Sequence, residues 1–149
     1  MKSVHLVTLN AILATGFGIA FALYGPLMIA MFGVPEIPEE NVLLYWNVAS
    51  FARLFGAALF GLGILIWSLR GILRSGSLTA RGKRGILFAL LLANGLGAFV
   101  SITQQFSIWL NSAGWVITGV FTVLFLGYVY FVFLPTNEKS NTERQRSGV

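Results

Sequence analysis

Four long apolar stretches, separated by short segments that hold almost all of the charge, constrain this chain more than any other feature. They span about residues 4–31, 44–69, 85–107 and 113–134. The hydrocarbon core of a bilayer takes roughly 20 helical residues to cross, so each stretch is long enough. With 56% hydrophobic and only 10% charged residues among 149, the chain is too apolar for a water-soluble core of ordinary size.

None of the stretches alternates apolar and polar residues as a barrel strand does, so we expect helices. The sequence predicts an all-α fold, an integral membrane four-helix bundle with antiparallel helices. The bundle is expected to occupy residues 1–134, and residues 135–149 form a polar cytoplasmic tail. The first stretch is far longer than the apolar core of a signal peptide, so we expect it to be retained as a helix.

The basic residues predict how the bundle sits in the membrane. On one side would lie Lys2, Arg70, Arg74, Arg81, Lys83, Arg84, Lys139, Arg144 and Arg146. Because positively charged loops face the cytoplasm, both termini and the 70–84 segment are predicted to be cytoplasmic. Glu36, Glu39 and Glu40 fall in a loop on the opposite side. This topology accounts for the net charge of +5 without a nucleic-acid partner, and the expected partner is the lipid bilayer.

Local signals predict where the helices bend and begin. Gly25 and Pro26 should kink the first helix near its outer end, because Pro removes a helical hydrogen bond. The glycine-containing 70–84 segment is predicted to be a flexible loop, with Ser77 or Thr79 able to cap the third helix. Two interfacial belts are predicted from the aromatic residues, an outer one at Tyr45, Trp46, Trp109 and Trp115 and an inner one at Trp67, Tyr128 and Tyr130.

Small residues at every fourth position predict which helix faces touch. The ladders are Ala14, Gly18 and Ala22 on the first helix, Ala52 and Gly56 on the second, and Ala89, Ala93, Gly97 and Ser101 on the third. Small side chains let backbones approach, and packing rather than the hydrophobic effect holds helices together in lipid. Asn10, in the inner half of the first helix, is predicted to form an interhelical hydrogen bond.

Arg53 breaks the apolar pattern of the second stretch. It lies seven residues beyond Trp46, roughly 10 Å toward the membrane centre. An Arg at the centre costs about 2.5 to 3.5 kcal/mol on insertion scales, so something must compensate the charge. In the simplest arrangement Arg53 reaches outward to a loop glutamate such as Glu39, or to carbonyls at a helix end.

Arg53 could instead line a small pocket that opens outward, together with polar residues of the third stretch. Asn94, Gly97, Ser101 and Gln104 share one helical face, and Gln105 follows them. A cation beside this stripe would suit an anionic or amphiphilic molecule such as a lipid. The candidate ligand-binding residues are therefore Arg53, Asn94, Ser101, Gln104, Gln105 and Glu39.

The sequence indicates no other chemistry. Without Cys, disulfides, thiol redox chemistry and iron–sulfur ligation are excluded. His5 is the only histidine and the chain has no Asp, so we expect no metal site. No nucleophile–base pair, phosphate loop or pair of intramembrane carboxylates is visible. We therefore expect no catalytic residues and no cofactor, and a protein that is not an enzyme.

A family resemblance is carried by two segments, Gly25-Pro26 to Phe32-Gly33-Val34-Pro35 and the run ARLFGAALFGLG from Ala52 to Gly63. They resemble the small bacterial four-helix membrane proteins of the DoxX-like group. In that group an Arg followed by small residues and Gly opens the second helix, which corresponds here to Arg53, Gly56, Gly61 and Gly63. The resemblance implies a four-helix fold in the bacterial cytoplasmic (inner) membrane and no defined activity.

Two classes of function remain. The first is a non-enzymatic accessory subunit or homo-oligomeric interaction protein, whose helix faces dock in a larger membrane complex. The alternative is a binder or transporter of a small lipophilic or anionic molecule, through an outer-leaflet polar pocket around Arg53. A pocket that reaches Arg53 would favour the binder, whereas small residues left uncovered by the chain's own helices would favour the subunit.

Overall fold

A computed structural model describes residues 3–33, 42–75 and 77–133. It contains the helices α1 (Ser3–Met31), α2 (Val42–Ser75), α3 (Ala80–Gln104) and α4 (Ser112–Phe133), and a π-helical turn, η2 (Gln105–Trp109), that continues α3. All regular structure in these residues is helical, and each of the four α-helices is long and apolar enough to cross a membrane. The predicted all-α fold with four membrane-length helices is confirmed. The predicted acidic loop at 36–40 and the tail at 135–149 lie outside the described residues.

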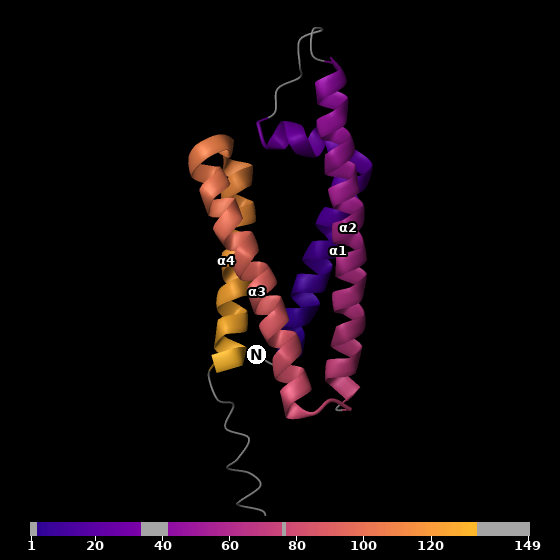
Figure 1. Cartoon of the computed structure of the whole chain (residues 1–149), viewed down its shortest axis with the longest axis vertical. Helices are drawn as coiled ribbons and strands as arrows, with labels where there is room; N and C mark the ends of the chain where they lie inside the picture. The colour runs from indigo at the N-terminus through magenta and orange to yellow at the C-terminus, as the bar shows by residue number, and fades with distance from the viewer. Residues whose placement is uncertain (1–2, 34–41, 76, 134–149) are drawn as a thin grey trace, which may run out of the picture.

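The helices form two pairs, α1 with α2 and α3 with α4 (Figure 1). Between the pairs, α1 contacts α4, whereas α2 and α3 do not pack along their lengths. The chain reverses between α3 and α4 at Leu110, whose φ of 46° is left-handed. This pairing decides which polar side chains can meet.

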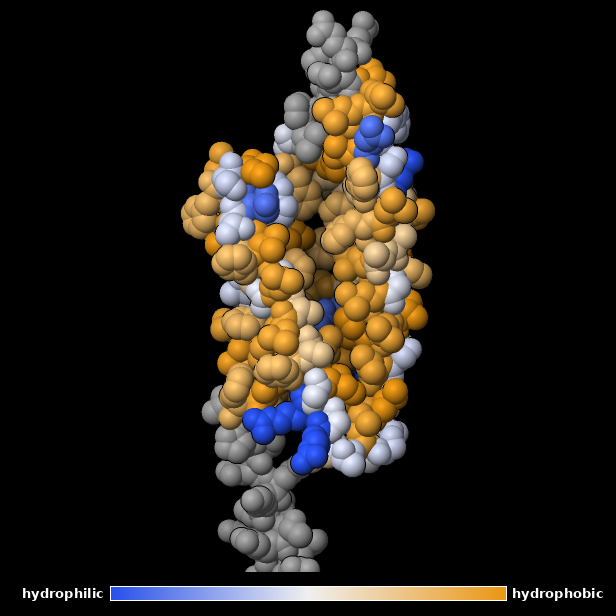
Figure 2. All heavy atoms as spheres, in the orientation of Figure 1, coloured by the Kyte–Doolittle hydropathy of each residue, from blue (hydrophilic) through white to orange (hydrophobic). Residues whose placement is uncertain are grey.

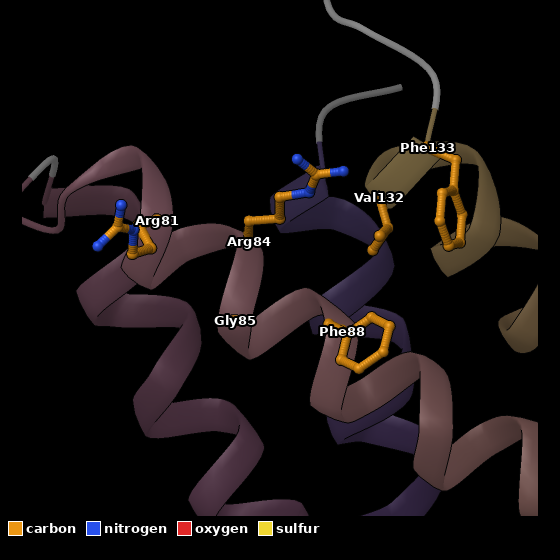
Figure 3. Close-up of a pocket in the computed structure, with 6 residues that line it drawn as sticks. All are labelled: Arg81, Arg84, Gly85, Phe88, Val132 and Phe133. Atoms are coloured by element: carbon orange, nitrogen blue, oxygen red, sulfur yellow. The ribbon is translucent and has the colours of Figure 1, made fainter.

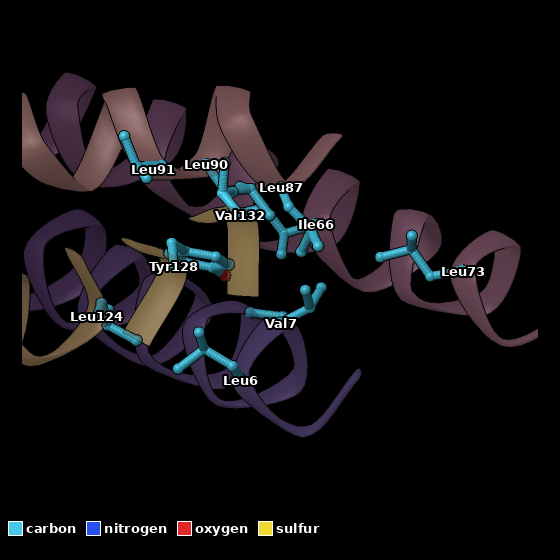
Figure 4. Packing of buried hydrophobic residues seen from close by; sticks show 11 residues of the cluster. Leu6, Val7, Ile66, Leu73, Leu87, Leu90, Leu91, Leu124, Tyr128 and Val132 are labelled. Carbon is cyan, nitrogen blue, oxygen red and sulfur yellow. The ribbon is translucent and has the colours of Figure 1, made fainter. Parts of the chain in front are cut away.

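All four helices contribute to one hydrophobic core, near the end where α2 leads into α3 (Figure 4). Its buried members are Leu6, Val7, Ala11, Ile66, Leu73, Leu87, Leu90, Leu91, Leu124, Tyr128 and Val132. Inside it, Asn10 Nδ2 donates a hydrogen bond of 3.1 Å to the Tyr128 hydroxyl, which confirms the predicted interhelical bond of Asn10. The prediction that Tyr128 belongs to an interfacial belt is wrong. Tyr128 is 0% exposed. Its hydroxyl can be buried in the core because Asn10 supplies a hydrogen-bond partner there.

Glycines bring α1 and α2 into close contact. A Cβ built on Gly18 would lie 2.6 Å from Phe60 Cα, and one built on Gly63 would lie 2.6 Å from the backbone nitrogen of Thr15. One built on Gly56 would lie 2.7 Å from the carbonyl carbon of Phe21. These contacts progress in opposite directions along the two helices. Only glycine fits at these three positions without a shift of the facing backbone.

Of the small-residue ladders predicted on the first two helices, Gly18, Ala22 and Gly56 lie in this contact. The ladder predicted on α3 is only partly buried. Ser101 is buried, whereas Ala89 and Ala93 are exposed. A step of four residues rotates by about 40° around a helix, so the stripe turns by about 120° between Ser101 and Ala89. The buried face of α3 combines small residues, Ala98 and Ser101, in its second half with larger ones such as Leu87 and Leu91 in its first half.

The predicted kink of α1 is confirmed. Tyr24, directly before Gly25 and Pro26, has non-helical backbone angles (φ −115°, ψ 33°). Beyond this point the end of α1 turns toward the α3–α4 connection (Figure 1). There the ring of Phe32 lies 4.9 Å from that of Trp109, centroid to centroid. The kink therefore makes a second contact between the two helix pairs.

The basic 70–84 segment is mostly helical, so the prediction of a flexible loop is wrong. The helix α2 continues to Ser75 and α3 begins at Ala80. Arginine is a good helix former and a helical glycine costs only about 1 kcal/mol, so the glycines do not interrupt either helix. Thr79 caps α3 as predicted, since its Oγ1 accepts a 3.2 Å hydrogen bond from the Gly82 amide. The guanidinium of Arg70 lies 4.4 Å from the centroid of the Trp67 ring.

Candidate functional site

Arg53 lies on α2 beside the kink of α1. A Cβ built on Gly25 would be 2.9 Å from Arg53 Cγ and 3.5 Å from its Nε, so the missing side chain of Gly25 makes room for the arginine stem. Arg53 as a whole is exposed. A long cationic side chain commonly rests its apolar stem on a neighbouring helix in this way. Glu39, its predicted partner, lies outside the described residues.

Asn94 and Ser101 are buried on α3, with 4% and 2% of their surface exposed. Asn94 Nδ2 donates to the Leu90 carbonyl at 2.7 Å, and Ser101 Oγ donates to the Ala98 carbonyl at 3.1 Å. Each side chain therefore bonds to its own helix, as Ser and Asn often do. These hydrogen bonds stabilise the two polar groups in the apolar interior without a ligand.

Gln105 organises the turn between α3 and α4. It is 2% exposed, and its Nε2 donates a 3.0 Å hydrogen bond to the Asn111 carbonyl. Asn111 in turn caps α4, because its Oδ1 accepts a 2.8 Å bond from the Gly114 amide. The Leu110 amide donates back to the Gln105 carbonyl at 3.3 Å and closes the π-helical turn. Gln104, also a candidate, is half-buried on the last turn of α3.

Asn111 and Thr118 are polar residues of this region that were not among the candidates. Three buried atoms have no hydrogen-bond partner among the described residues: Gln105 Oε1, Asn111 Nδ2 and Thr118 Oγ1. Asn111 had a usable signal, since Asn is a favoured N-cap and stands just before the predicted fourth helix. Thr118 had none, because a single Thr within an apolar stretch does not show which face it occupies.

The candidate residues divide between the two helix pairs. Arg53 lies on α2 and contacts α1, whereas Asn94, Ser101 and Gln105 are buried in the α3 chain segment. Because α2 and α3 do not pack along their lengths, the structure does not gather Arg53 and the polar stripe into one contact surface. Within residues 3–33, 42–75 and 77–133, no three His, Asp or Glu side chains lie together to hold a metal ion.

A surface depression lies at the other end of the molecule, between the start of α3 and the end of α4 (Figure 3). Its volume is about 350 Å³, and it is lined by Arg81, Arg84, Gly85, Phe88, Val132 and Phe133. None of these residues was a candidate. Basic residues beside a membrane-length helix are usual, so the sequence alone did not single out this pair of arginines.

Comparison with known proteins adds no functional assignment. No protein-family model matches the chain, and neither a curated protein nor a solved structure matches it.

Proposed function

We propose that this chain is a non-enzymatic membrane protein that acts as an accessory subunit or as a homo-oligomer. The observation that supports this proposal is that α2 has glycines that no other described part of the chain contacts. Gly61 and Gly71 are exposed, and a Cβ built on either one meets no atom within 4 Å. Small exposed residues allow a second helix to approach, and close packing is a main source of association energy in lipid.

The helix α2 thus has glycines on two different faces. Gly56 and Gly63 are buried against α1, whereas Gly61 lies between them in sequence and points elsewhere. Five residues separate Gly56 from Gly61, which corresponds to about 140° around the helix. One glycine face is used within the chain, and the other is available to a helix of a second copy or of another membrane protein.

The membrane arrangement is part of the same proposal. We propose an antiparallel bundle in a bacterial inner membrane, with both termini in the cytoplasm. The α1–α2 contacts progress in opposite directions along the two helices, which supports an antiparallel arrangement. The basic end of α2 leads directly to Arg81, Lys83 and Arg84 at the start of α3. This concentration of positive charge supports a cytoplasmic position for that end and for both termini. Figure 2 shows strongly hydrophilic residues at that end of an otherwise mostly apolar body. The pattern after Arg53 supports membership of the DoxX-like group.

Native mass spectrometry of the full chain in mild detergent tests the assembly role. We expect the mass of two or more copies, or of one copy with another membrane protein. Gly61→Leu should reduce the assembled fraction because its side chain would keep the partner helix away. Gly119→Leu is the matched control, since Gly119 on α4 is also exposed and open. A parent protein that is monomeric both in detergent and in lipid nanodiscs would contradict the proposal.

A second candidate function is binding of an anionic or amphiphilic molecule at Arg53, supported by the exposure of this cation beside the α1 kink. If Arg53 binds such a molecule, native lipid extract should raise the melting temperature of the parent more than that of Arg53→Gln. If Arg53 is structural, the variant should be as stable as the parent or more stable, because a charge at membrane depth is removed. Equal shifts by the extract would exclude Arg53 as the anchor.

A further inference from the structure

We propose that the depression between the start of α3 and the end of α4 binds the headgroup phosphate and upper acyl chain of an anionic phospholipid (Figure 3). Two arginines, Arg81 and Arg84, supply cations, and the remaining lining is apolar. A molecule that matches this surface carries a negative charge at one end and hydrocarbon at the other. The inference does not depend on the proposed assembly role.

The sequence of α3 explains how the depression forms. Arg81 and Arg84 are three residues apart, so they lie on neighbouring positions of the helix surface. Gly85 follows directly, and a Cβ built on it meets no atom within 4 Å, which leaves an open space below the arginines. In Figure 3 the side chains of Arg84 and Phe88 both extend from α3 toward α4, where Val132 lies, whereas Arg81 extends away from α4.

The charge around the depression favours a phosphate. Arg70 and Arg74 on the last turns of α2 add positive charge at the same end. No acidic residue stands in the described parts of these segments, 70–75 and 77–88. A guanidinium can donate two parallel hydrogen bonds to phosphate oxygens, which makes arginine well suited to this group. The positive end of the α3 dipole adds to the attraction.

The apolar lining favours a lipid over a free phosphate ion. Phe88 is 45% exposed and Phe133 is 61% exposed, so both rings present hydrocarbon surface beside the cations. Both belong to helices of membrane length. Phe88 lies one helical turn beyond Arg84, on the side toward the middle of α3. A phosphate held by Arg84 would therefore have its acyl chain directed along the apolar part of α3 and α4.

Lipid titration followed by native mass spectrometry tests the site in the full-length protein. We expect phosphatidylglycerol to bind more tightly than phosphatidylcholine. Arg84→Gln should weaken phosphatidylglycerol binding by about ten-fold, the loss that follows from one charge-assisted hydrogen bond to the phosphate. Arg81→Gln should weaken it less, because its side chain extends away from α4. Lys83→Gln is the matched control, because it removes the same charge from the same turn but does not line the depression. Equal weakening by Lys83→Gln would mean diffuse attraction and would overturn the proposal.

A second variant tests the apolar part without changing the charge. Gly85→Leu should fill the space below the arginines and weaken phosphatidylglycerol binding, while the melting temperature in detergent is kept because a Cβ there meets no atom. Unchanged lipid binding in a folded Gly85→Leu protein would show that the depression is not used. Displacement of phosphatidylglycerol by millimolar inorganic phosphate would indicate a site for the free ion and would also overturn the proposal.

Discussion

At the scale of single residues, the hydrogen bond between Asn10 and Tyr128 links the two helix pairs inside the apolar core. Tyr128→Phe removes the acceptor and leaves the Asn10 amide without its partner. We expect a loss of about 0.6 kcal/mol in the free energy of unfolding, up to about 1.7 kcal/mol, as for other hydrogen bonds between membrane helices. Reversible unfolding in mixed micelles measures this loss.

The control for this prediction is Tyr130→Phe, since Tyr130 lies two residues further on and is exposed. It should leave the free energy of unfolding nearly unchanged. The double variant Asn10→Leu, Tyr128→Phe should lose less than the sum of the two single variants, because the two side chains interact. Strict additivity would show that the 3.1 Å contact contributes no coupling energy.

The roles of Asn10 and Tyr128 differ in how far the sequence reveals them. A buried amide in a membrane helix must find a partner, so a hydrogen bond of Asn10 could be predicted from its position alone. A tyrosine near a helix end suits both a membrane interface and a core. Only the position of α1 beside α4 decides between these two environments, and no local pattern encodes that position.

At the scale of helices, the contact between α1 and α2 depends on glycines that face a backbone. Gly56→Ala should force the two helices apart at Phe21 and lower the stability by about 1 to 3 kcal/mol, the usual cost of overpacking. Gly16→Ala, on the open face of α1, should be neutral or stabilising, since alanine is the better helix former. Melting temperatures in detergent compare the two variants, and equal values would show that α1 does not restrict Gly56.

Hydropathy predicted the number and type of the helices, but it predicted their ends less accurately. The observed α2 has 34 residues and is about 51 Å long, which exceeds the ~30 Å hydrocarbon core. Its last turns carry Arg70 and Arg74, and charged residues in a helix that leaves the membrane give no apolar signal to extend the prediction. The cap at Thr79 was predictable because it depends on one side chain and its own helix.

At the scale of the whole molecule, the two helix pairs determine what the candidate residues can do. The polar face of α3 was visible in the sequence as a spacing of residues along one helix. Whether Arg53 joins that face depends on which helices are neighbours, and the sequence of a single chain does not specify this. The structure places α2 against α1 and leaves Gly61 and the depression at Arg84 as surfaces open to other molecules.

The central claim is that four helices cross the membrane with the basic end of the molecule in the cytoplasm. Single-cysteine labelling tests it directly, because the chain has no native Cys. Ser75 and Ser112 are exposed and lie at the end of α2 and the start of α4. We predict that an impermeant maleimide labels Ser112→Cys in intact cells, but labels Ser75→Cys only after permeabilisation. Labelling of Ser75→Cys from outside, or of both variants from the same side, would contradict the account.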